Sequence, residues 1–328
     1  MKLLCITDPL THPPADATVE LYNRLAEDPR FELFHLEAGR VGSGFGIPVT
    51  PIPRALAFHE FQRLADWPSA SAEFTDFELA FSRADRPYPP GYLEALVRHE
   101  KRTRFVARPS SVRDHGDRVF YRSVASPFMP AGIVTRSARP AREFIRFHKK
   151  VVVKQNQSYG GKGVAKLWCE GTQWFIDRPG TPRQEHPSLE RLLEALFASD
   201  SEPFEFVRYL ERVAEGDKRV LVIDGEIYGG FLRVATDGGW INNISSGGVA
   251  RPATVTPREE EIIGATWRAY QERGLFALGY DFLMDDSGEW ILSEINVGNL
   301  AGFGELEQTS GLPAFDRLLD WLAAFPTR

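Results

Sequence analysis

The sequence has little cysteine: Cys5 and Cys169 are its only two in 328 residues. Two cysteines cannot build a disulfide framework, and these two lack the spacing of a metal-binding pair. No apolar segment approaches the roughly 20 residues that a transmembrane helix needs. The amino terminus also reaches Asp8 before any signal-like stretch develops. We therefore expect a cytoplasmic protein without a membrane partner.

The sequence also lacks an excess of basic residues. Its 39 Lys and Arg stand against 45 Asp and Glu, which gives a formal charge of −6. A dedicated nucleic-acid binder normally carries a basic field, so this class is excluded. The 43% hydrophobic and 26% charged fractions are those of a globular protein. At about 150 residues per domain, the length predicts two domains, or one large α/β body with an added lobe.

Hydrophobic periodicity predicts an α/β fold. Residues 2–7 and 31–36 have strand patterns and 18–26 a helical one, and this β-α-β order favours a parallel sheet. A loop is expected over 39–53, where glycine and proline are frequent. Further strands are predicted at 77–81, 104–107, 151–154, 164–168, 204–210, 218–223, 226–234, 277–284 and 290–295, and helices at 91–98, 117–125, 138–148, 189–197, 257–273 and 312–324.

A glycine-rich turn joins two predicted strands between Lys154 and Val164. Glycine backbones can approach phosphate oxygens without a Cβ in the way. The turn is not a P-loop, because no helix follows it and no Gly-Lys-Ser/Thr closes it. Lys154 ends a hydrophobic strand, where a bound phosphate would supply the partner that a cation needs. The alternative is an ordinary β-hairpin with glycines in its turn.

Asp281, Glu294 and Asn296 form a second constellation. The turn Asp285-Asp-Ser-Gly288 predicts an antiparallel hairpin between their strands. The two-residue period of a strand puts Glu294 and Asn296 on one face, and the hairpin can bring Asp281 beside them. Two carboxylates and an amide oxygen suit Mg²⁺ bridged to a nucleotide phosphate. The alternative, a solvated strand face, fits less well because the strands are otherwise apolar.

Basic residues form a third group. Lys218 and Arg219 open one predicted strand and Arg233 ends the next, with the hairpin dipeptide Asp224-Gly225 between the strands. Each is more commonly an ordinary surface charge. Together with Lys154 they could form a pocket for phosphate and carboxylate oxygens.

Several motifs occur in an order typical of one known family. They are Ile6-Thr-Asp-Pro9 with Asp16-Ala-Thr18, Arg83-Ala-Asp-Arg-Pro-Tyr-Pro89, Pro109-Ser-Ser-Val-Arg-Asp114, Gly216-Asp-Lys-Arg-Val-Leu-Val-Ile-Asp-Gly-Glu226, Gly274-Leu-Phe-Ala-Leu-Gly-Tyr-Asp281 and Ser293-Glu-Ile-Asn-Val297. Over nearly the whole chain, the sequence resembles the bacterial glutathione synthetase family of the ATP-grasp superfamily. The resemblance implies an α/β ATP-grasp fold with an N-terminal parallel-sheet domain at 1–115, a lid subdomain with the glycine-rich flap at 116–210, and a C-terminal catalytic subdomain at 211–328.

The resemblance also implies roles for individual residues. Lys154, Arg219 and Arg233 are the implied catalytic residues, and Asp281, Glu294 and Asn296 the implied metal ligands. Nucleotide contacts are implied for Arg118, Lys154, Gly160, Gly161, Gly163, Tyr209, Leu210 and Asp217. Substrate contacts are implied for Asp16, Asn243, Asn299, Ala301 and Gly302. ATP and Mg²⁺ are the implied cofactors, with Mn²⁺ as the alternative ion.

Some positions depart from the family pattern. Gln155 and Gln157 replace a proline and an aspartate beside the flap, and Arg118 replaces a lysine. Ala107 replaces an asparagine, and Ile241 replaces an arginine. The family's Thr-Ser-Pro-Thr-Gly loop is here Gly298-Asn-Leu-Ala-Gly302. Because that loop lies beside the substrate in the family, the change favours a different acceptor.

The expected activity is ATP-dependent ligation of a carboxylate to an amine through an acyl phosphate, with release of ADP and phosphate. Amino acids or dipeptides are the expected substrates. Glutathione synthetase proper, acting on γ-glutamylcysteine and glycine, is the first alternative. A non-catalytic nucleotide-binding protein is the second. The family analogy suggests a homo-oligomer, but the amphipathic segment Asp316–Phe325 could equally serve the chain's own core.

Overall fold

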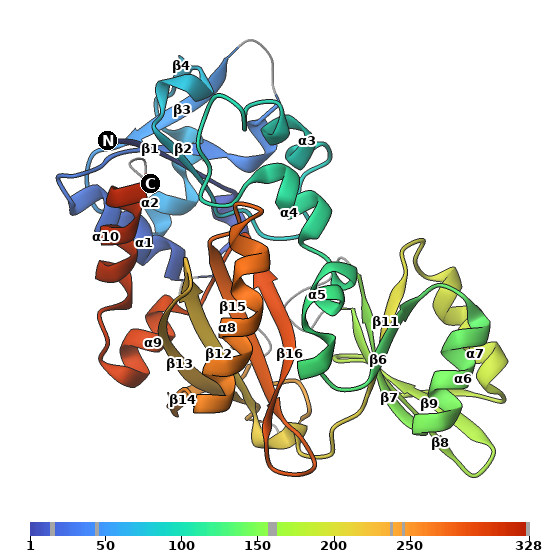
Figure 1. Ribbon diagram of the computed structural model, residues 1–328. Coiled ribbons are helices and arrows are strands. Elements are labelled where there is room, and N and C mark those ends of the chain that lie inside the picture. The colour runs from blue at the N-terminus through green and yellow to red at the C-terminus, as the bar shows by residue number, and fades with distance from the viewer. Residues whose placement is uncertain (14–16, 43–45, 157–162, 237–238, 245–246, 326–328) are drawn as a thin grey trace.

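The computed structural model describes residues 1–13, 17–42, 46–156, 163–236, 239–244 and 247–325. Three β-sheets follow one another along the chain (Figure 1). We call them the N-terminal sheet, the lid sheet and the central sheet. Together with the helices that cover them they confirm the α/β fold class.

The N-terminal sheet has the strand order β4-β3-β2-β1-β5. Its centre is parallel, because β1 pairs in parallel with both β2 and β5, whereas β3 and β4 are antiparallel additions at one edge. The elements here are β1 (Lys2–Thr7), α1 (Ala17–Glu27), β2 (Glu32–Glu37), β3 (Ile47–Ile52), α2 (Phe58–Gln62), β4 (Ala70–Ala72), β5 (Leu79–Ser82), α3 (Tyr92–Val97) and α4 (Pro109–His115).

The prediction of a loop over 39–53 was wrong, because β3 lies within it. Buried Ile47, Val49 and Ile52 supply a strand pattern that Pro48 and Pro51 interrupt in the sequence. Proline cannot donate to a ladder, but short pairings near a sheet edge tolerate it. The segment 104–107, by contrast, makes only isolated bridges to Ala80 and Leu275.

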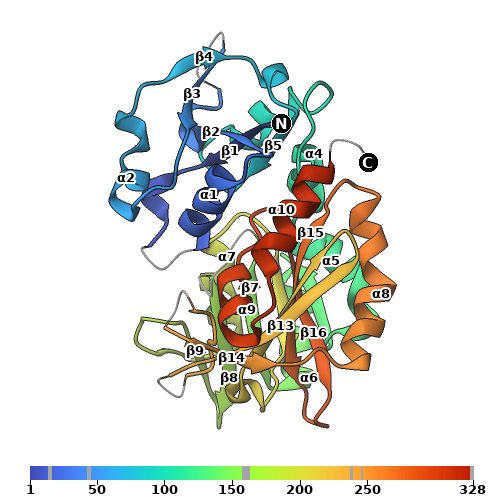
Figure 2. The same cartoon turned by 90° about the vertical axis from the view of Figure 1, so that its left-hand side faces the viewer.

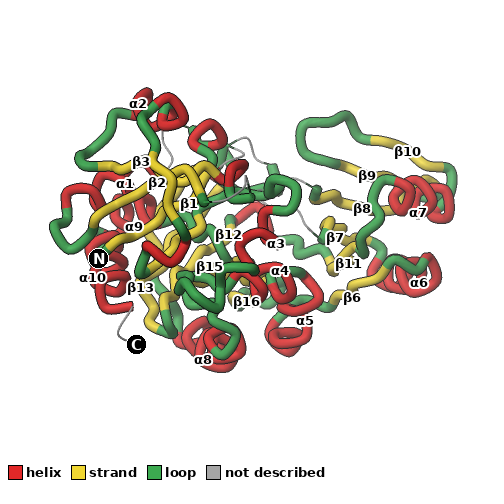
Figure 3. The backbone as a smooth tube through the Cα atoms, turned by 90° about the horizontal axis from the view of Figure 1, so that it is seen from above, coloured by secondary structure: helices red, strands yellow, loops and turns green. Residues whose placement is uncertain are grey.

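The lid sheet is antiparallel throughout, with the order β10-β9-β8-β7-β11-β6. The helices α6 and α7 cover its outer face (Figure 3). Ile145 of α6 and Leu193 of α7 join the buried strand residues there. Its other face points toward the central sheet. The elements are β6 (Gly132–Thr135), α6 (Ala138–His148), β7 (Lys150–Gln155), β8 (Val164–Glu170), β9 (Gln173–Asp177), β10 (Gln184–His186), α7 (Leu189–Ala198) and β11 (Phe204–Arg208).

The central sheet is also antiparallel, with the order β14-β13-β12-β15-β16. It separates two cores: α5 and α8 pack on one face, and α9 and α10 pack on the other together with α1 (Figure 2). The elements are α5 (Arg118–Ala125), β12 (Asp217–Ile223), β13 (Glu226–Val234), β14 (Val249–Ala253), α8 (Pro257–Gln271), β15 (Ala277–Met284), β16 (Trp290–Val297), α9 (Phe303–Ser310) and α10 (Ala314–Ala324).

The two predicted hairpins of the central sheet are confirmed. Asp224 and Gly225 both have positive φ, 51° and 84°, as a two-residue turn of type I′ requires. Glycine is needed at 225 for a second reason, because a Cβ there would lie 2.9 Å from the Trp267 ring. β15 and β16 pair with Asp281 opposite Glu294.

The C-terminal amphipathic helix α10 serves the chain's own core. Phe315, Leu318 and Leu322 on this helix are buried in the cluster that includes α1 and the N-terminal sheet. The apolar face of α10 therefore gives no support for an oligomer, and the homo-oligomer stays a prediction. The predicted domain boundaries also stay predictions. Among the described helices, none is both long and apolar enough to cross a bilayer.

Candidate active site

Two adjoining cavities lie beside the central sheet. The lid cavity, of about 140 Å³, lies between the lid sheet and the central sheet. The N-terminal cavity, of about 520 Å³, lies between the central sheet and loops of the N-terminal region. Residues shared by both linings mark where the cavities meet: Arg118, Arg219, Arg233, Asn243, Glu294 and Asn296.

The lid cavity is apolar at one end and charged at the other. Val152, Val164 and Val207 of the lid sheet line it on one side, and Leu283 of the central sheet lines it on the other. Tyr209 and Leu210, predicted to contact a nucleotide base, also line it where the chain leaves the lid sheet. Such a slot suits a flat heterocycle joined to an anionic chain.

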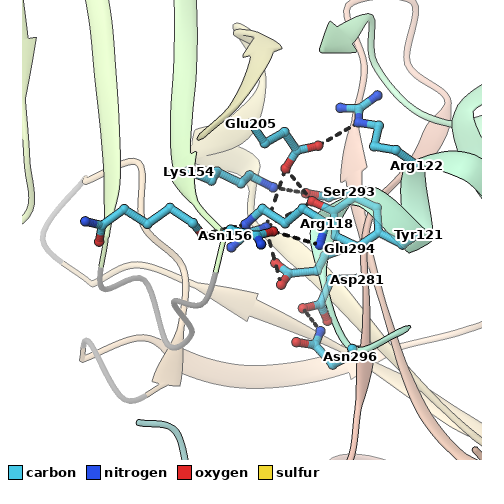
Figure 4. A network of polar contacts seen from close by, with 12 residues as sticks. Arg118, Tyr121, Arg122, Lys154, Asn156, Glu205, Asp281, Ser293, Glu294 and Asn296 are labelled. Atoms are coloured by element: carbon cyan, nitrogen blue, oxygen red, sulfur yellow. Dashed lines mark hydrogen bonds and ion pairs between the residues drawn. The ribbon is translucent and has the colours of Figure 1, made fainter. Parts of the chain in front are cut away.

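A buried ionic network closes the charged end (Figure 4). Glu205 on β11 lies opposite Lys154 on β7, and its carboxylate accepts hydrogen bonds from Tyr121 and from Nε of Arg122, the latter at 2.6 Å. Nη1 of Arg118 lies 3.5 Å from both Glu205 and Glu294. Burial would raise the pKa of Glu205, but the charges of Lys154, Arg118 and Arg122 outweigh it and lower the pKa. Glu205 is therefore an anion inside a group of three cations.

Arg118 is positioned from two sides. Asp117 caps the N-terminus of α5 by accepting a hydrogen bond from the backbone N–H of Phe120. The Nε of Arg118 donates to the backbone oxygen of Gln155 at 2.7 Å, at the end of β7.

Lys154 reaches from the lid sheet to the central sheet, where it donates to Oγ of Ser293 at 3.4 Å. Burial lowers the pKa of Lys154, and Glu205 and Glu294 act in the opposite direction.

Asp281 lies between two guanidinium groups. Arg219 donates to it through Nε and Nη2, both at 2.7 Å, and Nη2 of Arg233 lies 3.0 Å from it. Nδ2 of Asn296 donates to its second oxygen at 2.9 Å. Burial would raise the pKa of Asp281, but the two guanidinium groups outweigh it and lower the pKa to about 2. Arg233 also donates to Asp217, which lines the lid cavity.

The predicted metal ligands lie together, but not in equivalent surroundings. Glu294 and Asn296 are on one face of β16 and line both cavities, and the Glu294 side chain is 26% exposed. Because Asn296 turns its amide nitrogen to Asp281, its oxygen is left as an acceptor. These oxygens fit a hard cation. The four lone-pair positions of Asp281 already face four donors, so Asp281 can bind a metal only by giving one of them up.

The predicted substrate residues are divided between the described and the undescribed parts of the chain. Asn243, Asn299, Ala301 and Gly302 all line the N-terminal cavity. Gly302 has a φ of 115°, and a Cβ there would lie 3.0 Å from Phe231, so the start of α9 needs glycine at this position. Asp16, Gly160 and Gly161 lie outside the described residues, whereas Gly163 accepts a hydrogen bond from the backbone N–H of Gln155.

Sequence reasoning missed two groups of polar residues. The first is Glu205 with Tyr121 and Arg122; a charge inside the apolar strand Phe204–Arg208 was the available signal. The second is Asp85 with His12. Asp85 belongs to the motif at Arg83–Pro89, but nothing in the sequence predicts that His12 lies beside it. Within the described ranges, no three His, Cys, Asp or Glu side chains gather as a metal cluster.

Solved structures share the fold of this protein. A D-cycloserine synthetase aligns with a TM-score of 0.64 at 14% identity, covering 98% of this chain and 100% of that chain. A RiPP-associated ATP-grasp ligase of Chryseobacterium gregarium, solved with ADP and a leader and core peptide, aligns with a TM-score of 0.61 at 14% identity, covering 99% and 96%. The chain has the ATP-grasp fold.

Sequence comparison identifies the family. Residues 118–311 match the family described as prokaryotic glutathione synthetase, ATP-grasp domain, and the chain belongs to this family. A glutathione synthetase of Brucella melitensis is 30% identical, over 73% of this chain and 71% of the relative. A glutathione synthetase of Neisseria meningitidis serogroup B is 25% identical, over the full length of both. The protein is an ATP-grasp ligase, and its family uses ATP with a divalent metal.

Proposed function

We propose that this enzyme joins a carboxylate to an amine through an acyl phosphate, with release of ADP and phosphate. The observation that carries the proposal is the junction of the two cavities, which Arg219, Arg233, Glu294 and Asn296 all line. A nucleotide in the lid cavity would extend its phosphates toward this junction. A substrate in the N-terminal cavity would meet them there.

The reaction has two steps. First, a carboxylate oxygen of the substrate attacks the γ-phosphorus, the bond from this phosphorus to the β,γ-bridging oxygen breaks, and ADP leaves. Second, the amine nitrogen attacks the acyl carbon, the carbon–oxygen bond to the phosphoryl group breaks, and phosphate leaves with the amine proton. Phosphoryl transfer of this kind depends mainly on positioning and charge neutralisation.

The basic residues have separate tasks in this proposal. Lys154 and Arg118, at the charged end of the lid cavity, hold the phosphates of ATP. Arg219 and Arg233 stabilise charge on the transferring phosphoryl group and on the oxyanion of the acyl intermediate. Asp281 holds both guanidinium groups in place, since it accepts hydrogen bonds from each.

The metal fits the acidic side of the junction. Glu294 and Asn296 would hold Mg²⁺, or Mn²⁺, through side-chain oxygens, and Asp281 would join them on releasing one donor. Bound there, the ion would neutralise charge on the phosphates. The glycine-rich turn at 160–163 is the proposed cover of these phosphates.

Amino acids or dipeptides are the proposed substrates. The curated relatives are named glutathione synthetases, so γ-glutamylcysteine with glycine is the second candidate pair. The loop 298–302 counts against this second pair, because Asn299 and Ala301 replace hydroxyl residues beside the substrate cavity. A non-catalytic role is set aside, since the chain is an ATP-grasp ligase.

An ADP-release screen tests the proposal. The enzyme is incubated with ATP, Mg²⁺ and a matrix of amino acids and dipeptides, and products are identified by mass spectrometry. We expect one donor and acceptor pair to give stoichiometric ADP, phosphate and an amide. Activity with γ-glutamylcysteine and glycine alone would select the second candidate. ADP release without any amide would contradict ligation.

A further inference from the structure

Asp85 is a carboxylate held in a fixed position on the wall of the N-terminal cavity. It follows β5 in sequence, and its Oδ1 accepts a hydrogen bond from Nδ2 of Asn299 at 2.6 Å. Its Oδ2 lies 3.9 Å from Nδ1 of His12, whose side chain is completely buried. The Asp85 side chain keeps 28% exposure and lines the cavity.

His12 is itself anchored to the N-terminal sheet. Its Nε2 lies 2.7 Å from Oγ1 of Thr7, at the end of β1. The Thr7 hydroxyl donates its one proton to the backbone oxygen of Arg83 at 2.9 Å. Nε2 of His12 must therefore be the donor in the contact with Thr7. This chain of contacts fixes the histidine ring beside Asp85.

Charged residues of both signs line the cavity. Asp85 and Glu305 line it on the side of the N-terminal loops and α9. At the junction with the lid cavity, the two guanidinium groups of Arg219 and Arg233 line it together with the carboxylate of Glu294. Arg86, next to Asp85 in sequence, also lines the cavity, and it donates to the backbone oxygen of Gly116 at 2.9 Å. A cavity with a carboxylate at one end and guanidinium groups at the other complements a molecule that carries both an ammonium and a carboxylate.

The distance between the two ends suits a small molecule. Asn299 follows Asn296 by three residues, so their Cα atoms are at most about 11 Å apart. Asn299 contacts Asp85 directly, and Asn296 contacts Asp281 at the junction. A single amino acid or a dipeptide can therefore reach both Asp85 and the place where its carboxylate would be phosphorylated.

We infer that Asp85 binds the protonated amino group of the carboxylate substrate, with Asn299 as its positioning residue. The phosphorylated substrate is then an amino acid or small peptide with a free amino group, and not a simple carboxylic acid. This inference rests on the proposed ligase function. The inference also gives Asn299 a role. Asn299 stands where the family loop has a hydroxyl residue, and its side-chain amide holds the carboxylate of Asp85.

Hydroxylamine makes the test independent of the natural acceptor, because it captures acyl phosphates as hydroxamates. Amino acids and dipeptides are assayed in pairs, with the amino group free or acetylated, in wild type, Asp85→Asn and Asn299→Ala. Glu94→Gln, an exposed change on α3, is the matched control. KM for ATP and binding of Mg-ADP are measured alongside as readouts of the lid cavity.

In wild type and in Glu94→Gln, we expect kcat/KM to be about 100-fold higher for a donor with a free amino group than for its acetylated partner. A difference of this size is expected when one member of a charge pair is removed. Asp85→Asn removes this preference by raising KM for the free-amino donor, with KM for ATP unchanged. Asn299→Ala reduces the preference about 10-fold, and it serves as the test if Asp85→Asn does not fold.

Equal use of free and acetylated donors by wild type overturns the inference, as does a preference that survives in Asp85→Asn. In both cases hydroxamate still forms, so the ligase proposal stands. Absence of hydroxamate with every donor, while Mg-ADP binds, overturns the ligase proposal and this inference with it.

Discussion

Glu205 and Lys154 face each other on neighbouring antiparallel strands, at the end of the lid cavity where the charges gather. Glu205 has no solvent exposure, and Arg118, Arg122 and Tyr121 surround its carboxylate. A buried carboxylate inside such a group offsets the mutual repulsion of the cations before a nucleotide arrives. The site is therefore arranged in advance for an anion.

Glu205→Gln is expected to lower the free energy of unfolding by about 3 kcal/mol, because it leaves buried cations without their carboxylate. Mg-ADP should then raise the melting temperature of the variant by more than that of wild type, since phosphate oxygens replace the missing charge. Differential scanning calorimetry with and without Mg-ADP measures both effects. Glu202→Gln, an exposed change just before β11, is the control. Equal ligand-induced shifts in the variant and wild type would contradict the role of Glu205.

Glu294→Gln is expected to reduce Mg²⁺-dependent ADP release about 100-fold or more, because the variant loses charge on the proposed metal ligand. The fold should persist, since Glu294 is partly exposed and belongs to a hairpin held by its backbone ladder. Steady-state rates over a range of Mg²⁺ concentrations, with circular dichroism as the fold check, measure this.

Glu289→Gln changes an exposed glutamate of the same hairpin and should behave as wild type. Turnover of Glu294→Gln at the wild-type rate and the wild-type Mg²⁺ dependence would remove Glu294 from the metal site.

Asp177 connects the lid sheet to the loop that follows β13. Its carboxylate accepts a hydrogen bond from Nε1 of Trp240 at 3.2 Å, and Nζ of Lys166 lies 3.3 Å from it. Trp240 lines the lid cavity, and Nζ of Lys166 lies 5.5 Å from the centre of its ring. Asp177→Asn keeps an oxygen acceptor for Trp240 but removes the negative charge beside Lys166. It should therefore weaken Mg-ADP binding about 5-fold, the order of one interaction of this kind.

The weakening is expected in the dissociation rate, because the contact lies between two parts that must separate to release a nucleotide. Stopped-flow displacement of Mg-ADP measures it. Glu185→Gln, an exposed change on β10 of the same lid sheet, should not change the dissociation rate of Mg-ADP. An unchanged dissociation rate in Asp177→Asn would show that the contact does not restrain the lid.

The sequence was most informative where a function depends on local periodicity. Glu294 and Asn296 share a face because strands repeat every two residues, and the Asp-Gly turn at 224–225 fixes its hairpin through positive φ. These arrangements follow from neighbours in the chain. The hairpins that carry Asp281 and Arg219 could therefore be predicted without coordinates.

Contacts between distant segments could not be predicted in the same way. Asp85 and Asn299 are 214 residues apart, and Glu205 meets Arg118 across 87. Such pairs depend on how the three sheets are placed, which no single-sequence pattern encodes. The β3 error has a related cause, because Pro51 is tolerated only through the pairing that β3 makes at the sheet edge.

His35 on β2 provides a test of stability against pH that is separate from the active site. It is 3% exposed, and its Nδ1 contacts the hydroxyl of Tyr22 at 2.9 Å. Burial lowers its pKa to about 3. A histidine in an unfolded chain has a pKa near 6.5. Between pH 6.5 and pH 3, His35 therefore binds a proton in the unfolded chain but not in the folded chain. The contribution of His35 to stability is therefore complete above pH 6.5 and is lost as the pH falls below it.

His35→Gln keeps a polar partner for Tyr22 but removes the titration. Wild type should lose up to about 1.4 kcal/mol of stability per pH unit between pH 6 and pH 4 through this one residue. The variant should lose correspondingly less over the same interval. Urea unfolding at pH 7, 6, 5 and 4 measures the two slopes, and His59→Gln, an exposed change on α2, should keep the wild-type slope. Equal slopes in His35→Gln and wild type would mean that His35 is protonated in the folded protein, since only a residue with the same proton occupancy in both states leaves the slope unchanged.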